Sequence, residues 1–450
     1  MKKRLAALAM GLTLTISLLG GCGGNADNTA DTGNETVIES GSESVPDQQQ
    51  SEANTESTGE TPVITVWAWD SAFNGTAMEE ADKLYEGATV NFVEMSKADC
   101  LQKIHTILAS GVTDDLPDIV LIGDLSAQGY LMSYPGAFMP MDDVIDYNDF
   151  ADYKKASVSY DGAGYGVPFD TGVAGLFYRV DYIEEAGYTK EDMQDLTWYD
   201  YMELGKKLKE KGHLLQTYNP NDIAEFQIML QSAGKWYTDA AGNADFINND
   251  VLKECFEIFK TFNESDYVKV VSDWTEFTGA FNGGDVACVI RGSWISSSIM
   301  AAEDQSGKWA VAPVPKLNAA GATNKSNQGG SSWYVLSNGE NASVAADFLA
   351  QTFGGSTELY NTLLADKNIV GTYLPASTVE AYDLSQDFYG GQTVNADLAE
   401  WLSQIPAVDT GAFSSEAQTS LLGVVPDYLS GGDLDSCLKT ATEQFEQLIQ

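Results

Sequence analysis

The strongest constraint on the fold is an alternation of strand-like and helix-like segments that begins at residue 63. The strand-like segments are rich in β-branched and aromatic residues, and the helix-like segments carry apolar residues at helical spacing. In the order strand, helix, strand, helix, strand, they occupy residues 63–69, 76–86, 89–94, 101–110 and 118–122. This order predicts βαβ units and a parallel sheet, and therefore an α/β fold.

The ends of the predicted parallel strands are candidate ligand positions. In open α/β sheets, ligands bind beyond the carboxyl ends of the strands. The first strand ends at Trp69 and Asp70, and the third ends just before Asp124. We therefore expect these side chains to face a binding site.

The rest of the chain is more helical. Thr197 and Asp200 have the spacing of a capping box, which predicts a helix that begins there and ends near Gly212. Strands are predicted at 286–290 and 310–313. Further helices are predicted at 250–262, 342–353, 356–365 and 434–449.

The first 22 residues predict export. Three basic residues at positions 2–4 precede an uncharged run at 5–19, which is too short for a comfortable membrane span. The run ends in Leu-Gly-Gly-Cys22, which resembles a bacterial lipobox. The resemblance implies a signal peptide at 1–21, cleavage before Cys22 and a lipid on its sulfur. An ordinary secretory signal with an incidental cysteine is the alternative.

Residues 22–60 predict a flexible acidic tether. The segment is rich in small and polar residues and contains no Lys or Arg. Such a composition cannot bury enough apolar surface to offset the entropy of ordering. We expect a folded body that begins near residue 62 and is held near the membrane by the tether.

Charge excludes several classes of partner. The 450 residues include 24 Lys+Arg and 66 Asp+Glu, a formal net charge of −42. Nucleic acids and anionic membrane surfaces are bound by clustered basic residues, so neither is an expected partner. A length of 450 residues predicts two or three domains.

The sequence gives little support for catalysis. Its two histidines, His105 and His213, lie 108 residues apart, and none of the common hydrolase or metalloprotease motifs occurs. We predict no catalytic residue, no metal site and no cofactor. The cysteines of the folded body are interpreted as buried free thiols, with disulfides as the alternative: Cys100, Cys255, Cys288 and Cys437.

Seven short stretches occur in an order that resembles a known family. They lie at residues 64–70, 116–120, 165–168, 176–179, 197–198, 280–285 with 292–294, and 329–332. In this order they resemble the family 1 extracellular solute-binding proteins of carbohydrate ABC importers, the maltose-binding-protein-like group. The resemblance covers residues 62–450, although the last hundred match only in their helical pattern.

The resemblance implies a two-lobed, type II periplasmic-binding-protein-like fold. Each lobe would hold a mostly parallel sheet flanked by helices, with the ligand in the cleft between the lobes. The first lobe would comprise 62–168 plus 292–343, and the second 169–291 plus 344–450. Residues 165–169 would form the first hinge crossing.

Carboxylates and aromatic rings suit a sugar, because carboxylates accept hydrogen bonds from hydroxyls and rings pack on C–H patches. On this basis and on the resemblance, the predicted ligand-binding residues are Trp69, Asp70, Asp124, Asp170, Trp236, Arg291, Trp294 and Trp333. Helix caps, a structural ion pair and core packing are the alternatives for them. The tryptophans assigned to packing are Trp198, Trp274, Trp309 and Trp401.

The resemblance implies a monomeric lipoprotein that binds a carbohydrate and delivers it to the transmembrane permease subunits of an ABC transporter. The carbohydrate expected is an oligosaccharide. Its place would be the outer face of the cell membrane, anchored through Cys22, and the anchoring type favours a Gram-positive surface. The alternatives are a lipid-anchored glycoside hydrolase or lyase, a sugar sensor that serves a histidine kinase, and a non-sugar ligand such as a polyamine or phosphoester.

Overall fold

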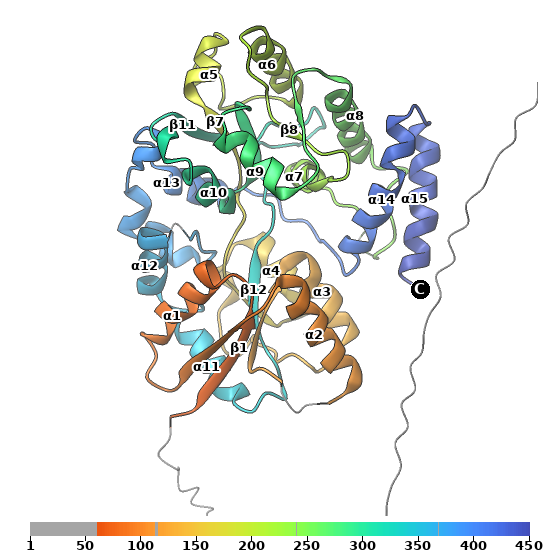
Figure 1. Ribbon diagram of the computed structural model, residues 1–450. Helices are drawn as coiled ribbons and strands as arrows, with labels where there is room; N and C mark the ends of the chain where they lie inside the picture. Colours follow the sequence, from red (N-terminus) through yellow and green to blue (C-terminus); the bar gives the residue numbers. More distant parts are fainter. Residues whose placement is uncertain (1–60, 113–115, 240, 368) are drawn as a thin grey trace, which may run out of the picture. The chain divides into compact units, whose positions relative to one another are not determined.

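The computed structural model describes residues 61–112, 116–239, 241–367 and 369–450 (Figure 1). The predicted signal peptide, Cys22 and the predicted tether lie outside the described residues. Within the described part of the chain, no helix is both long enough and apolar enough to span a bilayer.

The first sheet has five strands in the order β2-β1-β3-β12-β6. Strand β1 pairs in parallel with β2 and β3, as the alternation of strands and helices predicts. Strand β12 joins this parallel core in antiparallel orientation and pairs with β3 and β6. The bounds are β1 Val63–Ala68, β2 Thr89–Glu94, β3 Ile119–Gly123, β6 Gly166–Pro168 and β12 Ser331–Val335.

Helices cover both faces of this sheet. Residues Ile119 and Leu121 of β3 pack on one face against α1 (Thr76–Asp82), α11 (Ala342–Gln351) and α12 (Thr357–Lys367). Val120 and Ile122 alternate to the other face and pack against α2 (Lys97–Ser110) and α3 (Asp124–Ser133). A strand buried on both faces reads as a continuous apolar run, which is why this strand was predictable. We call this sheet with its helices the first lobe.

The second sheet has three antiparallel strands in the order β10-β7-β11. Their bounds are β7 Ala174–Arg179, β10 Cys288–Gly292 and β11 Trp309–Pro313. One face is covered by α6 (Trp198–Glu210), α7 (Ala224–Ser232), α8 (Asp250–Glu264), α14 (Ser414–Leu429) and α15 (Leu434–Leu448). The other face is covered by α9 (Trp274–Asn282), α10 (Ser296–Met300) and α13 (Val394–Leu402). We call this sheet with its helices the second lobe.

The described chain also contains shorter elements. They are the π-helix η1 (Ser71–Gly75), α4 (Asp152–Val158), α5 (Val180–Glu185), and the strand pairs β4 (Ser159–Tyr160) with β5 (Ala163–Gly164) and β8 (Thr217–Tyr218) with β9 (Lys269–Val270). The 3-10 helices are η2 (Tyr147–Asp149), η3 (Ser293–Ile295), η4 (Glu303–Gln305), η5 (Leu374–Thr378), η6 (Glu380–Asp383) and η7 (Asp387–Tyr389). Figure 1 shows α1, α2, α3 and α11 around β1, and α5, α6, α7 and α9 near β7.

Several local predictions are confirmed. The capping box at the start of α6 is complete, because the Thr197 side chain accepts from the Asp200 amide and the Asp200 side chain accepts from the Thr197 amide. The cysteines of the described chain are free and buried, as interpreted from the sequence: Cys100, Cys255, Cys288 and Cys437.

Two features differ from the prediction. The first sheet is mixed, and the second is antiparallel rather than mostly parallel, since both of its outer strands run antiparallel to β7. The lobe boundaries also differ: β11 falls in the range assigned to the first lobe, yet every residue of it pairs with β7. Most of α11 and all of α12 fall in the range assigned to the second lobe, yet their apolar faces pack on the first sheet.

Candidate ligand-binding site

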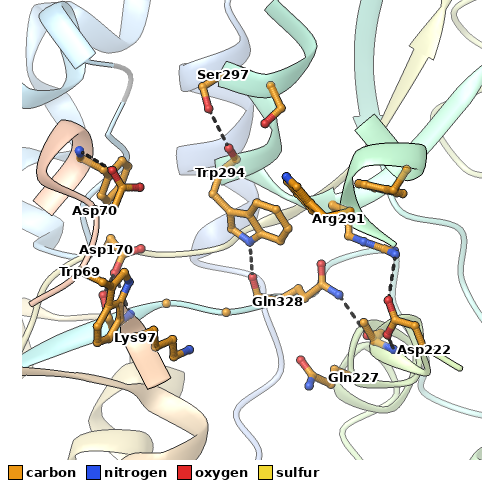
Figure 2. Close-up of a pocket in the computed structure, with 18 of the residues that line it drawn as sticks. Trp69, Asp70, Lys97, Asp170, Asp222, Gln227, Arg291, Trp294, Ser297 and Gln328 are labelled. Carbon is orange, nitrogen blue, oxygen red and sulfur yellow. Dashed lines mark hydrogen bonds and ion pairs between the residues drawn. The ribbon is translucent and has the colours of Figure 1, made fainter. Parts of the chain in front are cut away.

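A cavity of about 790 Å³ lies between the lobes (Figure 2). Its volume is within the range of about 300–1,000 Å³ that small-molecule sites occupy. The first lobe contributes residues from the end of β1, from η1 and from the start of α2. The second lobe contributes residues from α7, α9, β10 and the turn after β10, and the chain crossings at 170 and 328–331 close the cavity.

The first-lobe wall carries Trp69 and Asp70, as predicted from the strand end. The Trp69 ring is half-buried, and the Lys97 Nζ lies 5.3 Å from its centroid. Asp70 has a left-handed backbone (φ 57°), and its Oδ1 accepts from the Phe73 amide at 3.1 Å, which caps η1. Asn74 follows, and its Nδ2 donates to the Trp69 carbonyl at 2.7 Å. This wall thus presents one aromatic face beside polar groups.

The second-lobe wall carries two neighbouring tryptophans. The rings of Trp274 and Trp294 have centroids 6.2 Å apart and planes inclined by 35°. Trp294 was predicted here, whereas Trp274 was assigned to packing; it is 55% exposed and lines the cavity, so that assignment is wrong. The Trp294 Nε1 donates to the Gln328 carbonyl at 2.9 Å, which fixes the ring.

Arg291 lines the cavity as part of an ion pair. Its Nη1 donates to Glu225 Oε1 at 2.9 Å, its Nη2 lies 3.7 Å from Asp222 Oδ2, and its guanidinium lies over the Phe277 ring. Burial raises the pKa of Glu225, and the nearby Arg291 opposes that rise. Arg291 therefore lines the cavity, as predicted for a ligand contact, and also forms the structural ion pair that was its alternative role.

Asp170 lines the cavity at a chain crossing, where it was predicted. Its Oδ1 accepts from both the amide and the hydroxyl of Ser331, at 2.7 and 2.5 Å. One carboxylate oxygen is thus committed to holding β12 in place.

Asp124 does not line the large cavity, contrary to the prediction. Its Oδ2 lies 2.6 Å from the Nζ of the fully buried Lys154, and its Oδ1 accepts from the Ser332 hydroxyl at 3.0 Å. Burial raises the pKa of Asp124, and the ammonium of Lys154 opposes the rise. The carboxylate borders only a second cavity of about 30 Å³, on which Trp236 also lies.

The other two predicted tryptophans, Trp236 and Trp333, do not line the large cavity. Trp333 is fully buried, with its ring centroid 5.3 Å from that of Phe169 and 5.6 Å from that of Phe353, because its face of β12 is covered by helices. Trp236 is 5% exposed, and its Nε1 donates to the Ser414 hydroxyl at 2.8 Å, which ties it to α14.

The structure adds residues that sequence reasoning missed, among them Asn74, Lys97, Gln227 and Gln328. A single polar side chain in a helix or a connecting segment carries no distinctive sequence signal, so these residues could not be found from the sequence. In the described ranges, no group of three or more His, Cys, Asp or Glu residues is placed to hold a metal ion.

Comparison with known proteins agrees with this geometry. Residues 76–410 match the family of bacterial extracellular solute-binding proteins. A lactose-binding protein of Rhizobium radiobacter is 43% identical over 392 residues, which span 86% of this chain and 93% of that protein. An arabinooligosaccharide-binding protein of Halalkalibacterium halodurans is 24% identical over 258 residues, 55% of this chain and 56% of that protein.

Solved structures share the fold at lower identity. The GacH receptor of Streptomyces glaucescens, solved unliganded and with acarbose, is 17% identical with a TM-score of 0.71, over 86% of this chain and 98% of that one. The sugar-binding protein MalE of Xanthomonas citri is 16% identical with a TM-score of 0.71, over 86% and 97%. An ABC-transporter-associated protein of B. animalis subsp. lactis, bound to β-1,6-galactobiose, is 22% identical with a TM-score of 0.66, over 87% and 97%. The predicted α/β two-lobed fold is thus confirmed, and the chain belongs to the bacterial extracellular solute-binding proteins.

Proposed function

We propose that this protein captures a neutral oligosaccharide outside the cell and delivers it to the permease subunits of an ABC transporter. The observation that carries the proposal is the cavity between the lobes, which combines three tryptophan rings with hydrogen-bonding side chains: Trp69, Trp274 and Trp294. Rings suit the C–H faces of sugars and polar groups suit their hydroxyls. The lactose-binding relative at 43% identity supports this ligand class.

Several charged groups of the cavity wall already have protein partners. Glu225 and Asp222 face Arg291, and one oxygen of Asp170 is held by Ser331. Lys97 also lines the cavity and has no ion-pair partner among the described residues, so the tryptophan rings rather than the charges favour a sugar. Sugar hydroxyls can donate hydrogen bonds to the free carboxylate oxygens and accept them from the remaining N–H groups.

The proposed contacts keep five of the residues predicted from the sequence: Trp69, Asp70, Asp170, Arg291 and Trp294. Binding makes and breaks no covalent bond, so the protein acts as a carrier. The protein acts as a monomer whose two lobes close on the ligand, and the closed form binds the permease. The proposal includes lipid anchoring at Cys22 on the outer face of the membrane.

A fluorescence titration tests the ligand class. Because three tryptophans line the cavity, lactose or β-1,6-galactobiose should change the intrinsic emission and raise the melting temperature, while spermidine should do neither. At 100 times its Kd, a ligand stabilises the fold by about 2.7 kcal/mol, which is easily detected. Recovery of the sugar intact is expected; cleaved sugar would favour the hydrolase, and a response to spermidine alone would refute a sugar ligand.

Anchoring needs a separate measurement. The Cys22→Ala variant should leave the membrane fraction and lose incorporation of a labelled fatty acid, since the sulfur that carries the lipid is gone. The ligand titration of this variant should match that of the unchanged protein. Retention of the variant in the membrane fraction would contradict the anchor.

A further inference from the structure

Most hydrogen-bonding side chains of the cavity already have protein partners. Arg291 pairs with Glu225, and the Oδ1 of Asp170 accepts twice from Ser331. The Gln328 amide donates to the Ala224 carbonyl at 3.1 Å and accepts from the Gly292 amide at 3.2 Å. These groups hold the wall of the cavity and have limited capacity left for a ligand.

Gln227 differs from them. It lies on α7, is 9% exposed, and borders both the large cavity and the 30 Å³ cavity. In the described part of the chain, no group hydrogen-bonds its side-chain amide, and Figure 2 shows the amide without a dashed line. Its neighbour one turn later, Gln231, is similarly buried but donates to the Pro406 carbonyl and borders only the small cavity.

A nearly buried amide without a protein partner indicates a group kept for something that enters the cavity. The amide atoms of Gln227 still reach the open cavity, where a ligand hydroxyl can bond them in place of water. On the first-lobe wall, the buried Oδ1 of Asn74 is also without a partner in the described structure. Unpaired groups thus come from both lobes.

The chemistry of the amide selects among ligands. It offers two N–H donors and one carbonyl acceptor side by side. A sugar hydroxyl both donates and accepts, so one or two hydroxyls can satisfy both ends of the amide. An ammonium can use only the carbonyl, and a deprotonated phosphate can use only the N–H groups.

We infer that Gln227 is a specificity-determining residue, whose amide hydrogen-bonds hydroxyl groups of the bound sugar at both its nitrogen and its oxygen. The inference rests on the proposed function. It assigns to α7 a direct role in choosing among sugars, by the presence and position of a hydroxyl. A site built to bond a hydroxyl rejects analogues that lack it.

Affinity measurements on Gln227→Leu test the inference, with Gln231→Leu as the matched control on the same helix. With lactose, or β-1,6-galactobiose if lactose gives no signal, calorimetry should show at least a tenfold rise in Kd for Gln227→Leu and less than a twofold change for Gln231→Leu. The unchanged protein should bind one monodeoxy analogue of the same sugar at least tenfold more weakly than the sugar, and Gln227→Leu should not distinguish the two.

The melting temperature without ligand separates binding from a structural role. Gln227→Leu should melt at or above the unchanged protein, because no protein hydrogen bond is lost. Gln305→Leu should melt lower, because its buried amide has four hydrogen-bond partners. A lower melting temperature for Gln227→Leu, comparable with that of Gln305→Leu, would assign Gln227 to the scaffold.

The outcomes distinguish the two proposals. If the unchanged protein binds the sugar and Gln227→Leu binds it equally well, the inference is refuted and the proposed function stands. If the unchanged protein responds to none of the sugars, the proposed function fails and the inference fails with it.

Discussion

Removing Lys154 should destabilise the protein strongly at neutral pH. Its side chain is fully buried, and its Nζ contacts Asp124 Oδ2 at 2.6 Å and the Ser331 carbonyl at 2.9 Å. Lys154→Met keeps the apolar stem and removes the charge. Asp124 would then be a buried carboxylate with only the Ser332 hydroxyl as a side-chain partner.

The expected loss of stability follows from the interactions that Lys154→Met removes. Breaking a buried ion pair by removing one partner costs about 3–5 kcal/mol, because the other charge stays buried and uncompensated. The freed Ser331 carbonyl adds about 1 kcal/mol or more. A double variant, Asp124→Asn with Lys154→Met, removes the charge as well as the pair, so it should recover most of the loss.

The loss should depend on pH in a defined direction. The pKa of Asp124 is raised in the folded protein by burial, and Lys154 opposes that rise. A carboxyl whose folded pKa lies above its unfolded pKa binds more protons when folded, so stability falls as pH rises through that interval. Without Lys154, the pKa of Asp124 in the folded protein rises further, so the pH range over which Asp124 lowers the stability extends to higher pH. The loss of stability caused by Lys154→Met should therefore become smaller as the pH is lowered toward 4.

Urea denaturation at several pH values between 4 and 8 measures this deficit. We expect about 4–6 kcal/mol at pH 7, with a clearly smaller deficit at pH 4.5. A deficit below 1 kcal/mol at pH 7, or one that is the same at both pH values, would refute the argument from a buried, uncompensated carboxylate.

Three further substitutions separate the site from the scaffold. Trp274→Ala should raise the Kd for lactose roughly tenfold, because about 1.4 kcal/mol of contact between the ring and the sugar is lost, and the ligand-free melting temperature should change little because the ring is half-exposed. An unchanged Kd in calorimetry would show that Trp274 does not contact the sugar. Trp333→Ala should cost about 3–5 kcal/mol in urea denaturation yet leave the affinity of the folded fraction unchanged, and an affinity loss without a stability loss would contradict its core position. Gly330→Ala should cost roughly 1–3 kcal/mol, since φ is +102° and a Cβ would lie 2.6 Å from Asp124 Oδ2, whereas Gly321→Ala, with φ +83° and open space, should cost less; equal losses in denaturation would argue against the close contact.

The parallel part of the first sheet was predictable because its signals are local. Strands β1, β2 and β3 are short runs of β-branched and apolar residues separated by helical stretches, and their order alone indicates parallel pairing. The second sheet was not predictable in this way. Its strand β7 pairs with β10 and β11, which lie more than a hundred residues further along the chain, and nothing local specifies the antiparallel direction.

The predictions of site residues failed where a residue far away in the sequence determines the surroundings of the side chain. Asp124 follows a strand end, as Asp70 does, but Lys154 lies 30 residues further on and neutralises it. Trp274 was missed for a related reason. It shares a helix face with Phe277 and Phe281, which are buried, so periodicity favours packing, yet the first residue of α9 extends past that core into the cavity.

The crossing into β12 connects the cavity to both lobes. Before the two glycines 329 and 330, Gln328 is held by the second lobe, where its carbonyl accepts from the Trp294 indole. After them, Ser331 is held by the first lobe through Lys154, and its amide donates to Asp170. Both glycines have positive φ, of 91° and 102°, which residues with a side chain rarely adopt.

We expect rotation of the lobes to change the backbone angles of these two glycines, because the residues on each side are tied to opposite lobes. Trp294 and Asp170 both line the cavity, and each bonds the backbone on one side of the glycine pair. A ligand that contacts both residues consequently touches both sides of the pivot. Its binding energy can then favour one angle between the lobes without any separate element that transmits the change.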